Sequence, residues 1–599
     1  MTQTTLLQPS NEPKDIWYGT SGPKDAEIVI VGEAWGAEEA ATGKPLLGSS
    51  GTEFDRMLAE AGLDRTKCLV TSVIASRPAS GETWRFLHSK EEGQPRVGGI
   101  SPRPELVSEV RRLYAQIHSH PRRLVIALGN YALWALTNEA GSAVLRQSNG
   151  RPIAKEIAPY VPDSIMSWRG SMWYMLEDRF ATVPKYSKTP LLPIIHPTTI
   201  LKAWDTRAVT VHDLKARVPM ALKGDWRHRN PPVFLAPPTF EQCCNRLKLW
   251  IGNADRGTII ELAEDIETAR GFITCLGLAD SVNFAMSIPF IRKDGSGGFV
   301  SWWTIEQETE IVRLLRILNS HPNVRIVGQN FIYDTQYIQF WMAVIPKLDF
   351  DTMLAQNVMF PGTPKALDYL SSLFCKYHWY WKEDHKEWNL SGTIEDLLVY
   401  NCWDNVRTFE IAQSQRAVLK QIGMEPQMAF KMRVNDLCLR MMNRGILVDR
   451  TKRSSMLMEL NTALQDTYRE LEQIIPQEMV SPDNKTPWYR SSKQQNYLFY
   501  DALGFRTIQN RKTGNPTVGK EALMELKKRH PEFSGLFNRL DVAGSVANTA
   551  TVIQSPIDSD FRMRCSYNPG GTETHRLSSS KSAFGTGTNL QNLSKGEED

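Results

Sequence analysis

Three short acidic motifs in the middle third of the chain constrain its fold and chemistry more than any other feature. Asp265 and Glu267 lie two residues apart behind the apolar run 258–263, which predicts a β-strand. Because side chains alternate across a strand, both carboxylates are expected on one face, where they can share a cation. Asp334 ends the second motif, Asn-Phe-Ile-Tyr-Asp, and Asp404 ends the third, Tyr-Asn-Cys-Trp-Asp.

The third motif lies in the stretch 394–405, which predicts a helix. Tyr400 and Asp404 are four residues apart and therefore stack on one helical face. Hard divalent ions prefer carboxylate oxygens, and crowded carboxylates repel one another without them. The pattern therefore predicts a two-metal site that cleaves phosphodiester bonds, in which Asp265 bridges both ions and the Tyr400 hydroxyl orients the attacking water. The other expected ligands are Glu267, Asp334 and Asp404.

Each motif alone is common by chance, but all three occur in order. Together they resemble the DEDD exonucleases, in the tyrosine-containing branch that proofreads in family-A DNA polymerases. The segments 351–356 and 366–370 match further parts of that family. The resemblance implies a ribonuclease H-like exonuclease domain with a mixed sheet flanked by helices, hydrolysis from the 3′ end, and Mg²⁺ as the working ion, with Mn²⁺ as a substitute. It also implies that Asn330 contacts DNA.

Length and composition indicate a multidomain protein. The chain has 599 residues, 41% of them hydrophobic, and a formal net charge of +4. Its eight cysteines form no Cys-x-x-Cys pair, which favours a reducing, cytoplasmic location, namely the host cytoplasm if a phage encodes the chain. The sequence shows no apolar run of about 20 residues and no signal peptide, so we expect no membrane association.

Three apolar runs mark the region before the acidic motifs. They cover 27–31, 123–128 and 191–195, and the first two end at a glycine. Alternating with helical stretches, they predict a parallel sheet whose ligand site lies at the strand ends. The polar and then proline-rich stretch 226–238 predicts an interdomain connector. The expected domains are 1–225, 226–420, 421–560 and 561–599.

The amino-terminal region resembles the iron-sulfur type uracil-DNA glycosylases. The motifs that carry the resemblance are 32–39, 42–51, 71–78, the Leu-Gly pair at 128–129 and 196–202. In such enzymes a flipped uracil stacks on an aromatic ring and is read along its polar edge. Leu46 stands where the family has the stacking phenylalanine, and Ser72 where it has the asparagine that reads uracil. The implied pocket residues are Glu33, Glu39, Leu46, Ser72 and His196.

The cluster-binding cysteines of that family are missing. The chain has no amino-terminal Cys-x-x-Cys, and Ser76 occupies a usual cysteine position, so no iron-sulfur cluster is expected. Glu33, Glu39 and His196 could still polarise a base or activate water, which leaves a divergent glycosylase open. We favour a binding role, in which the domain holds the template or a partner subunit. The basic residues that suit this role are Lys44, Arg77 and Lys202.

Beyond residue 416 the chain is predicted to be mostly helical, with helices at 432–444 and about 452–472. The segment 485–529 then carries ten Lys or Arg against three acidic residues, a local charge of +7. Such a charge suits contacts to DNA phosphates, although a solvated basic face is the simpler alternative.

This carboxy-terminal part resembles the thumb and first palm strands of family-A DNA polymerases. The matching segments are 442–449, 491–498, 517–523, 574–579 and 589–592. His575 departs from the family, which usually has glycine there. The DNA-binding residues that the resemblance implies are Lys493, Arg511, Lys512, Arg576, Asn589, Gln591 and Asn592.

The expected fold is an α/β multidomain chain: a glycosylase-like parallel-sheet domain, a ribonuclease H-like exonuclease domain, a mostly helical thumb and an incomplete palm. The leading interpretation is the proofreading part of a phage-like replicative polymerase that binds primer-template DNA. The family's synthetic residues follow the Asn-Leu-Gln-Asn motif, and the chain ends seven residues after it. We therefore expect a second chain to supply fingers and remaining palm, with other replisome proteins as further partners; truncation is the rival explanation. The alternatives are a free-standing repair nuclease and glycosylase, or a non-catalytic DNA-binding scaffold.

Overall fold

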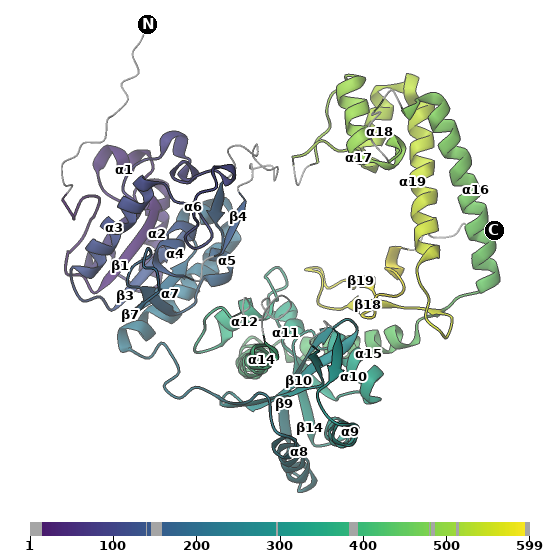
Figure 1. Ribbon diagram of the computed structural model, residues 1–599, viewed down its shortest axis with the longest axis horizontal. Coiled ribbons are helices and arrows are strands. Elements are labelled where there is room, and N and C mark those ends of the chain that lie inside the picture. The colour runs from purple at the N-terminus through teal and green to yellow at the C-terminus, as the bar shows by residue number, and fades with distance from the viewer. Residues whose placement is uncertain are drawn as a thin grey trace.

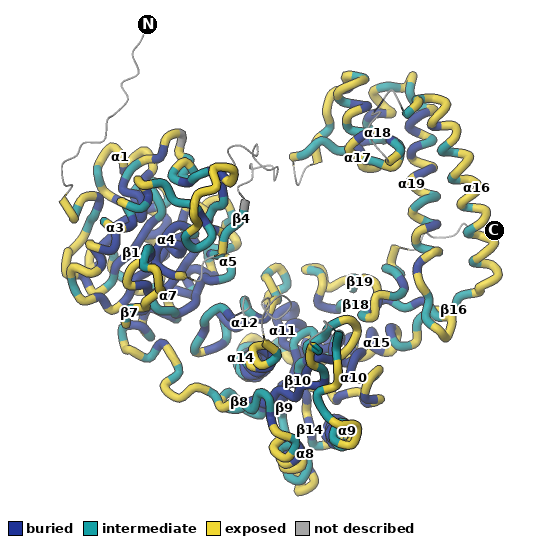
Figure 2. The backbone as a smooth tube through the Cα atoms, viewed as in Figure 1, coloured by how far each residue is buried: buried dark blue, intermediate teal, exposed yellow. Residues whose placement is uncertain are grey.

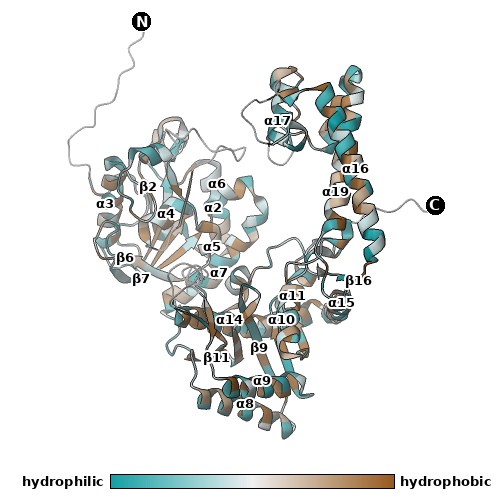
Figure 3. Cartoon of the chain, turned by 45° about the vertical axis from the view of Figure 1, so that its right-hand side comes forward, coloured by the Kyte–Doolittle hydropathy of each residue, from teal (hydrophilic) through white to brown (hydrophobic). Residues whose placement is uncertain are grey.

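The protein is described by a computed structural model, which covers residues 15–138, 141–144, 159–294, 298–381, 393–477, 480, 486–510 and 514–592. An N-terminal α/β domain and a central α/β domain lie next to each other, and a helical arm extends from the central domain (Figure 1). Hydrophobic residues gather on the strands of both sheets (Figure 3).

The N-terminal domain is built on a five-stranded sheet with the order β2-β1-β3-β7-β6. Strands β1 (Ile28–Ala34), β2 (Cys68–Ile74), β3 (Leu124–Leu128) and β7 (Tyr186–Ile194) are parallel, and β6 (Trp173–Leu176) is antiparallel to β7. Every residue of β2 and β3 is buried, as expected for parallel strands covered on both faces. The three predicted apolar runs are therefore strands of one parallel sheet.

Helices cover this sheet on both faces. They are α1 (Ala37–Thr42), α2 (Gly48–Glu60), α3 (Pro104–His118), α4 (Gly129–Leu136), α5 (Ile165–Trp168), α6 (Pro197–Lys202) and α7 (Arg207–Lys223). Two short strands, β4 (Ser142–Val144) and β5 (Tyr160–Pro162), pair antiparallel outside this sheet. Gly129 opens α4 directly after β3 with φ +86°, and a Cβ there would lie 2.4 Å from Glu33 Oε1. Glycine is therefore required for this turn beside the strand ends.

The central domain contains a six-stranded mixed sheet with the order β15-β14-β9-β10-β11-β8. Strands β9 (Ile260–Ala269), β10 (Phe272–Ser281) and β11 (Phe284–Pro289) form an antiparallel meander. Strands β14 (Val324–Gly328) and β15 (Leu348–Asp351) add to β9 in parallel, and β8 (Val233–Leu235) pairs in parallel with β11. A separate hairpin comprises β12 (Ile291–Lys293) and β13 (Phe299–Ser301).

The two faces of the central sheet carry different helices. Helices α8 (Phe240–Asp255) and α9 (Ile305–Ser320) share an apolar core with one face, whereas α14 (Ile394–Ile422) packs on the other. Helices α10 (Ile332–Met342), α11 (Thr352–Met359) and α12 (Leu367–Phe374) complete the domain. The predicted helix at 394–405 is thus the first part of α14.

Small residues allow α14 to approach the sheet closely. Ala263, Ala279 and Ala285 face Cys402 and neighbouring α14 side chains in a buried cluster. At Gly277 an added Cβ would lie 2.1 Å from the Asn401 side-chain oxygen. The backbone of β10 therefore touches the polar face of α14, and this contact fixes the helix that carries Tyr400 and Asp404.

The predicted connector 226–238 is only partly a connector. Residues 233–235 form strand β8, which pairs with β11 at the edge of the central sheet. Prolines flank this short strand on both sides, and in the sequence they indicate a linker. Prolines are nevertheless tolerated at a sheet edge, which is where the strand lies. The interpretation of the whole stretch as a linker was wrong for these three residues.

The helical arm begins with α15 (Glu425–Arg444), which ends at Gly445, and continues with α16 (Arg450–Ile474). Helix α16 runs beside α19 (Ser534–Gln554), while α17 (Ser492–Asn496) and α18 (Lys520–Arg529) pack at one end of the pair (Figure 1). Most of helix α16 is exposed along its length, and Leu471 is its one buried residue (Figure 2). Both predicted helices are present and are longer than expected.

The chain returns from the arm to the central domain. Strand β17 (Arg562–Met563) pairs with β16 (Ile446–Leu447), and β18 (Cys565–Asn568) pairs with β19 (Ser578–Lys581). The turn between β18 and β19 contains His575 at φ +59°, a left-handed conformation that glycine adopts without strain. The Asn357 side chain lies 3.0 Å from His575 Nδ1, so the histidine anchors this turn on α11.

None of the helices in the described part of the chain combines the length and apolar character needed to cross a bilayer. All eight cysteines are buried as free thiols.

Candidate functional site

The acidic residues of the central domain converge in space. Asp265 and Glu267 project from β9, and Asp404 projects from α14 on the same side of the sheet. One carboxylate oxygen from each of these three residues lies within 4.8 Å of the other two. Asp404 is buried, whereas Asp265 and Glu267 are partly exposed. We call these three residues and Asp334 the carboxylate cluster.

Asp334 lies behind the other three acids, in the first turn of α10. Its Oδ1 accepts a hydrogen bond from the Ile266 amide at 3.0 Å, which places it against the strand between Asp265 and Glu267. Burial, and then the charge of Asp265, raise the pKa of Asp334 well above its usual range. A bound cation would relieve this repulsion, because opposite charge favours the ionised carboxylate.

Two side chains donate hydrogen bonds to carboxylates of the cluster. The Asn401 amide nitrogen donates to Asp265 Oδ2 at 2.9 Å, and Asn401 in turn accepts from Ser287 Oγ at 2.8 Å. The indole Nε1 of Trp381 donates to Asp404 Oδ1 at 2.6 Å. Hydrogen bonds of this kind orient carboxylates for a metal ion. The sequence analysis missed both donors.

Tyr400 is buried one helical turn before Asp404. Burial, and then the charges of Asp404, Glu267 and Asp265, raise the pKa of its phenol. The hydroxyl therefore keeps its proton at neutral pH and can donate a hydrogen bond beside the cluster. This is the state needed to orient a water molecule.

A groove with a volume of about 400 Å³ lies at the start of α10, the helix that carries Asp334, although none of the four acids lines it. Asn330 and Tyr333 line it from the central domain, while the serine-rich strand β19 and Lys581 line it from the C-terminal hairpin. Asn330 has φ +55°, a conformation that asparagine tolerates better than most residues. Because Tyr333 and Asp334 are consecutive, the same turn of α10 serves both the groove and the cluster.

The N-terminal domain has its own pocket of about 500 Å³ at the carboxyl ends of β1 and β2. All five predicted pocket residues line it, and so do Arg77 and Lys202, which are exposed. Lys44 is exposed and is not part of the lining. Ser72 is buried in β2, and Leu46 is held at φ +57° with its carbonyl accepting from Arg65 at 2.8 Å.

The acids of this pocket accept hydrogen bonds from backbone amides. The two oxygens of Glu39 accept hydrogen bonds from the amides of Gly36 and Leu47, each at 2.9 Å. Glu33 Oε1 accepts from the Tyr131 amide at 3.0 Å. The sequence suggested that Glu39 could activate water, but its oxygens instead close the turn before α1. Burial lowers the pKa of His196, whose Nδ1 accepts from the Thr198 amide.

The residues of the N-terminal domain do not fit an iron-sulfur cluster. Cys68 is the one cysteine between residues 15 and 225, and it is buried in β2. Four protein ligands, usually cysteines, hold such a cluster.

The predicted DNA-binding residues are spread over the arm and the C-terminal hairpin. Lys493 and Arg576 are exposed, whereas Arg511 and Lys512 lie outside the described residues. Asn589 accepts hydrogen bonds from the Ser579 hydroxyl and from the Gln591 amide, and the Gln591 side chain donates to the Leu577 carbonyl. Asn589 and Gln591 therefore shape the loop after β19.

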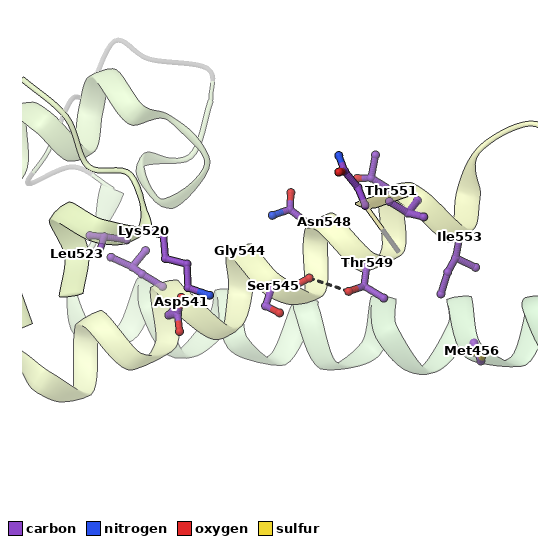
Figure 4. Close-up of a pocket in the computed structure, with 13 residues that line it drawn as sticks. Met456, Lys520, Leu523, Asp541, Gly544, Ser545, Asn548, Thr549, Thr551 and Ile553 are labelled. Carbon is purple, nitrogen blue, oxygen red and sulfur yellow. Dashed lines mark hydrogen bonds between the residues drawn. The ribbon is translucent and has the colours of Figure 1, made fainter. Parts of the chain in front are cut away.

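Asn592 lines a cavity of about 940 Å³ that runs along α19 and reaches Met456 of α16 (Figure 4). Lys520 and Asp541 lie near one end, and Gly544, Ser545 and Asn548 follow along the exposed face of α19. Small and uncharged polar side chains allow a sugar-phosphate backbone to approach a helix closely. The arm therefore offers a second candidate surface for nucleic acid.

Comparison with known proteins identifies the N-terminal domain. Residues 20–215 match the family model of the uracil DNA glycosylase superfamily. A type-4 uracil-DNA glycosylase of Archaeoglobus fulgidus is 30% identical over 118 residues, which are 20% of this chain and 50% of that protein. A type-4 uracil-DNA glycosylase of Thermotoga maritima is 37% identical over 62 residues, 10% of this chain and 32% of that protein. The chain thus spans half or less of these relatives' length.

The predicted resemblance of the N-terminal, glycosylase-like domain is thereby confirmed at the level of the superfamily. Among solved structures, the chain is similar to the POL domain of Pol1 from M. smegmatis in complex with DNA primer-template and dNTP. The sequence identity is 16%, the TM-score is 0.42, and the match covers 59% of this chain and 55% of that one.

Proposed function

We propose that the central domain removes nucleotides from the 3′ ends of DNA strands, as the proofreading exonuclease of a family-A DNA polymerase. The observation that carries this proposal is the approach of Asp265, Glu267 and Asp404 to within 4.8 Å through one oxygen each, with Asp334 directly behind. Carboxylates are brought this close at a high electrostatic cost unless a cation neutralises them.

The donor set fits hard divalent cations, because it consists of carboxylate oxygens. Asp265, Glu267, Asp334 and Asp404 would hold Mg²⁺ or Mn²⁺ ions. When bound, a pair of such ions stabilises the charge on the attacking and leaving oxygens of a phosphodiester. Tyr400, which keeps its phenolic proton, would orient the attacking water from the α14 side.

The groove at the start of α10 supports a single strand as the substrate. Asn330 and Tyr333 offer an amide and an aromatic ring to the terminal nucleotide, and Lys581 offers a positive charge to a phosphate. The serine hydroxyls of β19 add hydrogen-bond donors that do not read sequence. Such a groove favours frayed ends over paired ones.

A digestion assay tests the proposal. The full chain is incubated with a primer-template labelled at the 5′ end of the primer, with Mg²⁺ or with EDTA. We expect shortening from the 3′ end with Mg²⁺, no shortening with EDTA, and no shortening by Asp265→Ala. Glu241→Ala is the matched control, since Glu241 is an exposed carboxylate in the first turn of α8. Equal digestion by the wild type and Asp265→Ala would overturn the assignment.

For the glycosylase-like domain we propose DNA binding without base excision. The observations that favour this are Leu46 and Ser72 in the pocket, where the family has groups that stack and read uracil, and the engagement of Glu39 with backbone amides. Arg77 and Lys202 are exposed at the same pocket and suit phosphate contacts.

Two measurements in EDTA separate this role from repair. Fluorescence anisotropy with single-stranded DNA should show weaker binding by the double variant Arg77→Ala, Lys202→Ala than by the wild type. An excision assay on uracil-containing single strands should yield no abasic sites. Abasic sites formed by the wild type and lost in Glu33→Ala would establish glycosylase activity instead.

The association with a second polypeptide that carries fingers and remaining palm stays a prediction. Copurification of a chain with those motifs, together with nucleotide addition by the pair and not by either chain alone, would support it.

A further inference from the structure

Residues 375–381, which we call the linking segment, touch both the glycosylase-like domain and the carboxylate cluster. The segment follows α12 and leads toward α14. Helix α12 packs on α7, and α12 and α14 lie beside the glycosylase-like domain in Figure 1. A shift in the position of the linking segment would therefore alter contacts in both the glycosylase-like domain and the central domain.

Backbone hydrogen bonds tie the linking segment to the glycosylase-like domain. Arg217 of α7 is fully buried, and its guanidinium donates to the carbonyls of Ser372 at 2.8 Å and Lys376 at 2.6 Å. The Met172 amide donates to the His378 carbonyl at 2.8 Å. Because a buried guanidinium must find acceptors, these carbonyls are held in one arrangement.

A buried ion pair supports the same contact. Arg169 and Asp213 of the glycosylase-like domain approach to 2.5 Å, and Arg169 also donates to Ser372 Oγ of α12 at 2.9 Å. The Trp168 ring meets the Tyr380 ring edge-on at 5.6 Å between centroids. A contact that buries charges and aromatic rings together is specific in its geometry.

The other side of the linking segment packs on α14. The buried guanidinium of Arg407 donates to the Tyr377 carbonyl and lies 4.4 Å from the Trp379 ring centre and 5.6 Å from that of Trp381. Trp381 is 2% exposed, and its indole donates to Asp404 Oδ1 at 2.6 Å. The segment thus ends in a hydrogen bond to the carboxylate cluster.

We propose that Trp381 is a positioning residue for Asp404, and that the glycosylase-like domain sets this position by holding the linking segment. The inference rests on the proposed nuclease function. An indole donor on Oδ1 fixes the rotation of the Asp404 carboxylate, and thereby the placement of the oxygens that face Asp265 and Glu267. The indole can do so only while the segment keeps its place, and that place is specified by Arg217, Met172 and Trp168.

Direct binding of Mn²⁺ to the full chain, measured by calorimetry without DNA, tests the first half. Trp381→Phe keeps an aromatic ring but removes the N–H, and we expect Mn²⁺ affinity to fall by about tenfold. Trp379→Phe is the matched control, because the described contacts of Trp379 are with Arg407 and the His228 and Trp403 rings. It should bind Mn²⁺ as the wild type does.

Digestion then distinguishes positioning from general damage. Trp381→Phe should need more Mg²⁺ for half-maximal digestion and should recover most of its rate at saturating Mg²⁺, with the melting temperature close to that of Trp379→Phe. Unchanged Mn²⁺ affinity in Trp381→Phe, or equal weakening in both variants, overturns the role of the indole.

The second half is tested from the glycosylase-like domain. Trp168→Leu removes the ring that meets Tyr380 and leaves Trp381 intact, and it should weaken Mn²⁺ binding by a few-fold in the same direction. Normal Mn²⁺ affinity in a folded Trp168→Leu protein overturns the control by that domain. If Trp381→Phe does not fold, Trp168→Leu decides the inference.

Asp404→Asn separates these outcomes from failure of the proposed function. If Asp404→Asn also binds Mn²⁺ normally, the carboxylate cluster is not a metal site, and the nuclease proposal itself fails. If Asp404→Asn loses Mn²⁺ while Trp381→Phe keeps it, only the positioning inference fails.

Discussion

The carboxylate cluster and the glycosylase-like pocket both contain acids that short motifs single out, yet their oxygens face different partners. In the cluster, one oxygen each of Asp265, Glu267 and Asp404 faces the others within 4.8 Å. In the pocket, the two oxygens of Glu39 accept backbone amides. A motif places an acid on a strand or helix, but the donors around it decide whether it faces other acids or caps a turn.

The supports of the two sites differ as well. Two side chains donate to the cluster, Asn401 from α14 to Asp265 and Trp381 from the linking segment to Asp404. In the pocket the donors are backbone amides, that of Leu47 at the start of α2 for Glu39 and that of Tyr131 in α4 for Glu33. The cluster is therefore held by side-chain donors, whereas the pocket acids are held by backbone amides.

The largest expected effect distinguishes the acids of the two sites. Asp404→Asn should lower the rate of Mg²⁺-dependent 3′ digestion by about a thousandfold, equivalent to about 4 kcal/mol of barrier, because it removes a cluster charge. Glu33→Gln makes the same chemical change in the pocket and should leave digestion unchanged. The measurement is single-turnover shortening of a 5′-labelled single strand. A loss with Glu33→Gln as large as that with Asp404→Asn would remove the functional difference between the sites.

The second-largest expected effect is on stability and concerns the packing of α14 on strand β10. At Gly277 a Cβ would lie 2.1 Å from Asn401 Oδ1 and 2.2 Å from Asn405 Nδ2, so Gly277→Ala must displace these two buried side chains of α14. We expect a loss of about 3 kcal/mol in stability. At Gly32, beside the pocket, the nearest atom would be Ser72 Oγ at 3.3 Å, and Gly32→Ala should cost about 1 kcal/mol or less. Thermal unfolding of both variants checks the order, and a reversed order would show that α14 is not held by this contact.

Tyr400→Phe should have a smaller effect on catalysis than Asp404→Asn. The phenol keeps its proton because its pKa is raised, and the variant removes the hydrogen bond it can give to a water molecule. We expect a rate about 30-fold lower at saturating Mg²⁺, with unchanged Mn²⁺ affinity. Weaker Mn²⁺ binding in Tyr400→Phe would assign the phenol to metal binding instead of water orientation.

The faces of strand and helix on which the acids lie could be predicted from the sequence, because they follow from local periodicity. Asp265 and Glu267 share a face of β9 by strand alternation, and Tyr400 and Asp404 share a face of α14 by helical spacing. Likewise, the apolar runs at 27–31 and 123–128 predicted parallel strands.

The sequence did not predict the supporting residues, because they act across long separations in the chain. Asn401 lies next to Tyr400 and could have been noticed because Asp404 and Asn405 follow it by one turn on the same face of the helix. Trp381 carries no such signal, since its partner is set by the packing of the linking segment between two domains. The hydrogen bond that Glu39 accepts from the Leu47 amide also depends on a turn eight residues away.

The smallest expected effect tests the local role of Glu39. Glu39→Gln replaces one acceptor oxygen by an amide group that cannot accept from an N–H, so either the Gly36 or the Leu47 amide loses its partner. The cost of losing this cap is about 1 kcal/mol, which should speed local hydrogen exchange of those amides by about fivefold. Mass-spectrometric exchange on the full chain measures this, with Glu38→Gln on the same helix as the control. Because the change is local, digestion and Mn²⁺ affinity should not move. If exchange stays slow while uracil excision appears in the wild type and vanishes in Glu39→Gln, then Glu39 acts as a chemical group, and the distinction between a structural acid and a cluster acid does not hold.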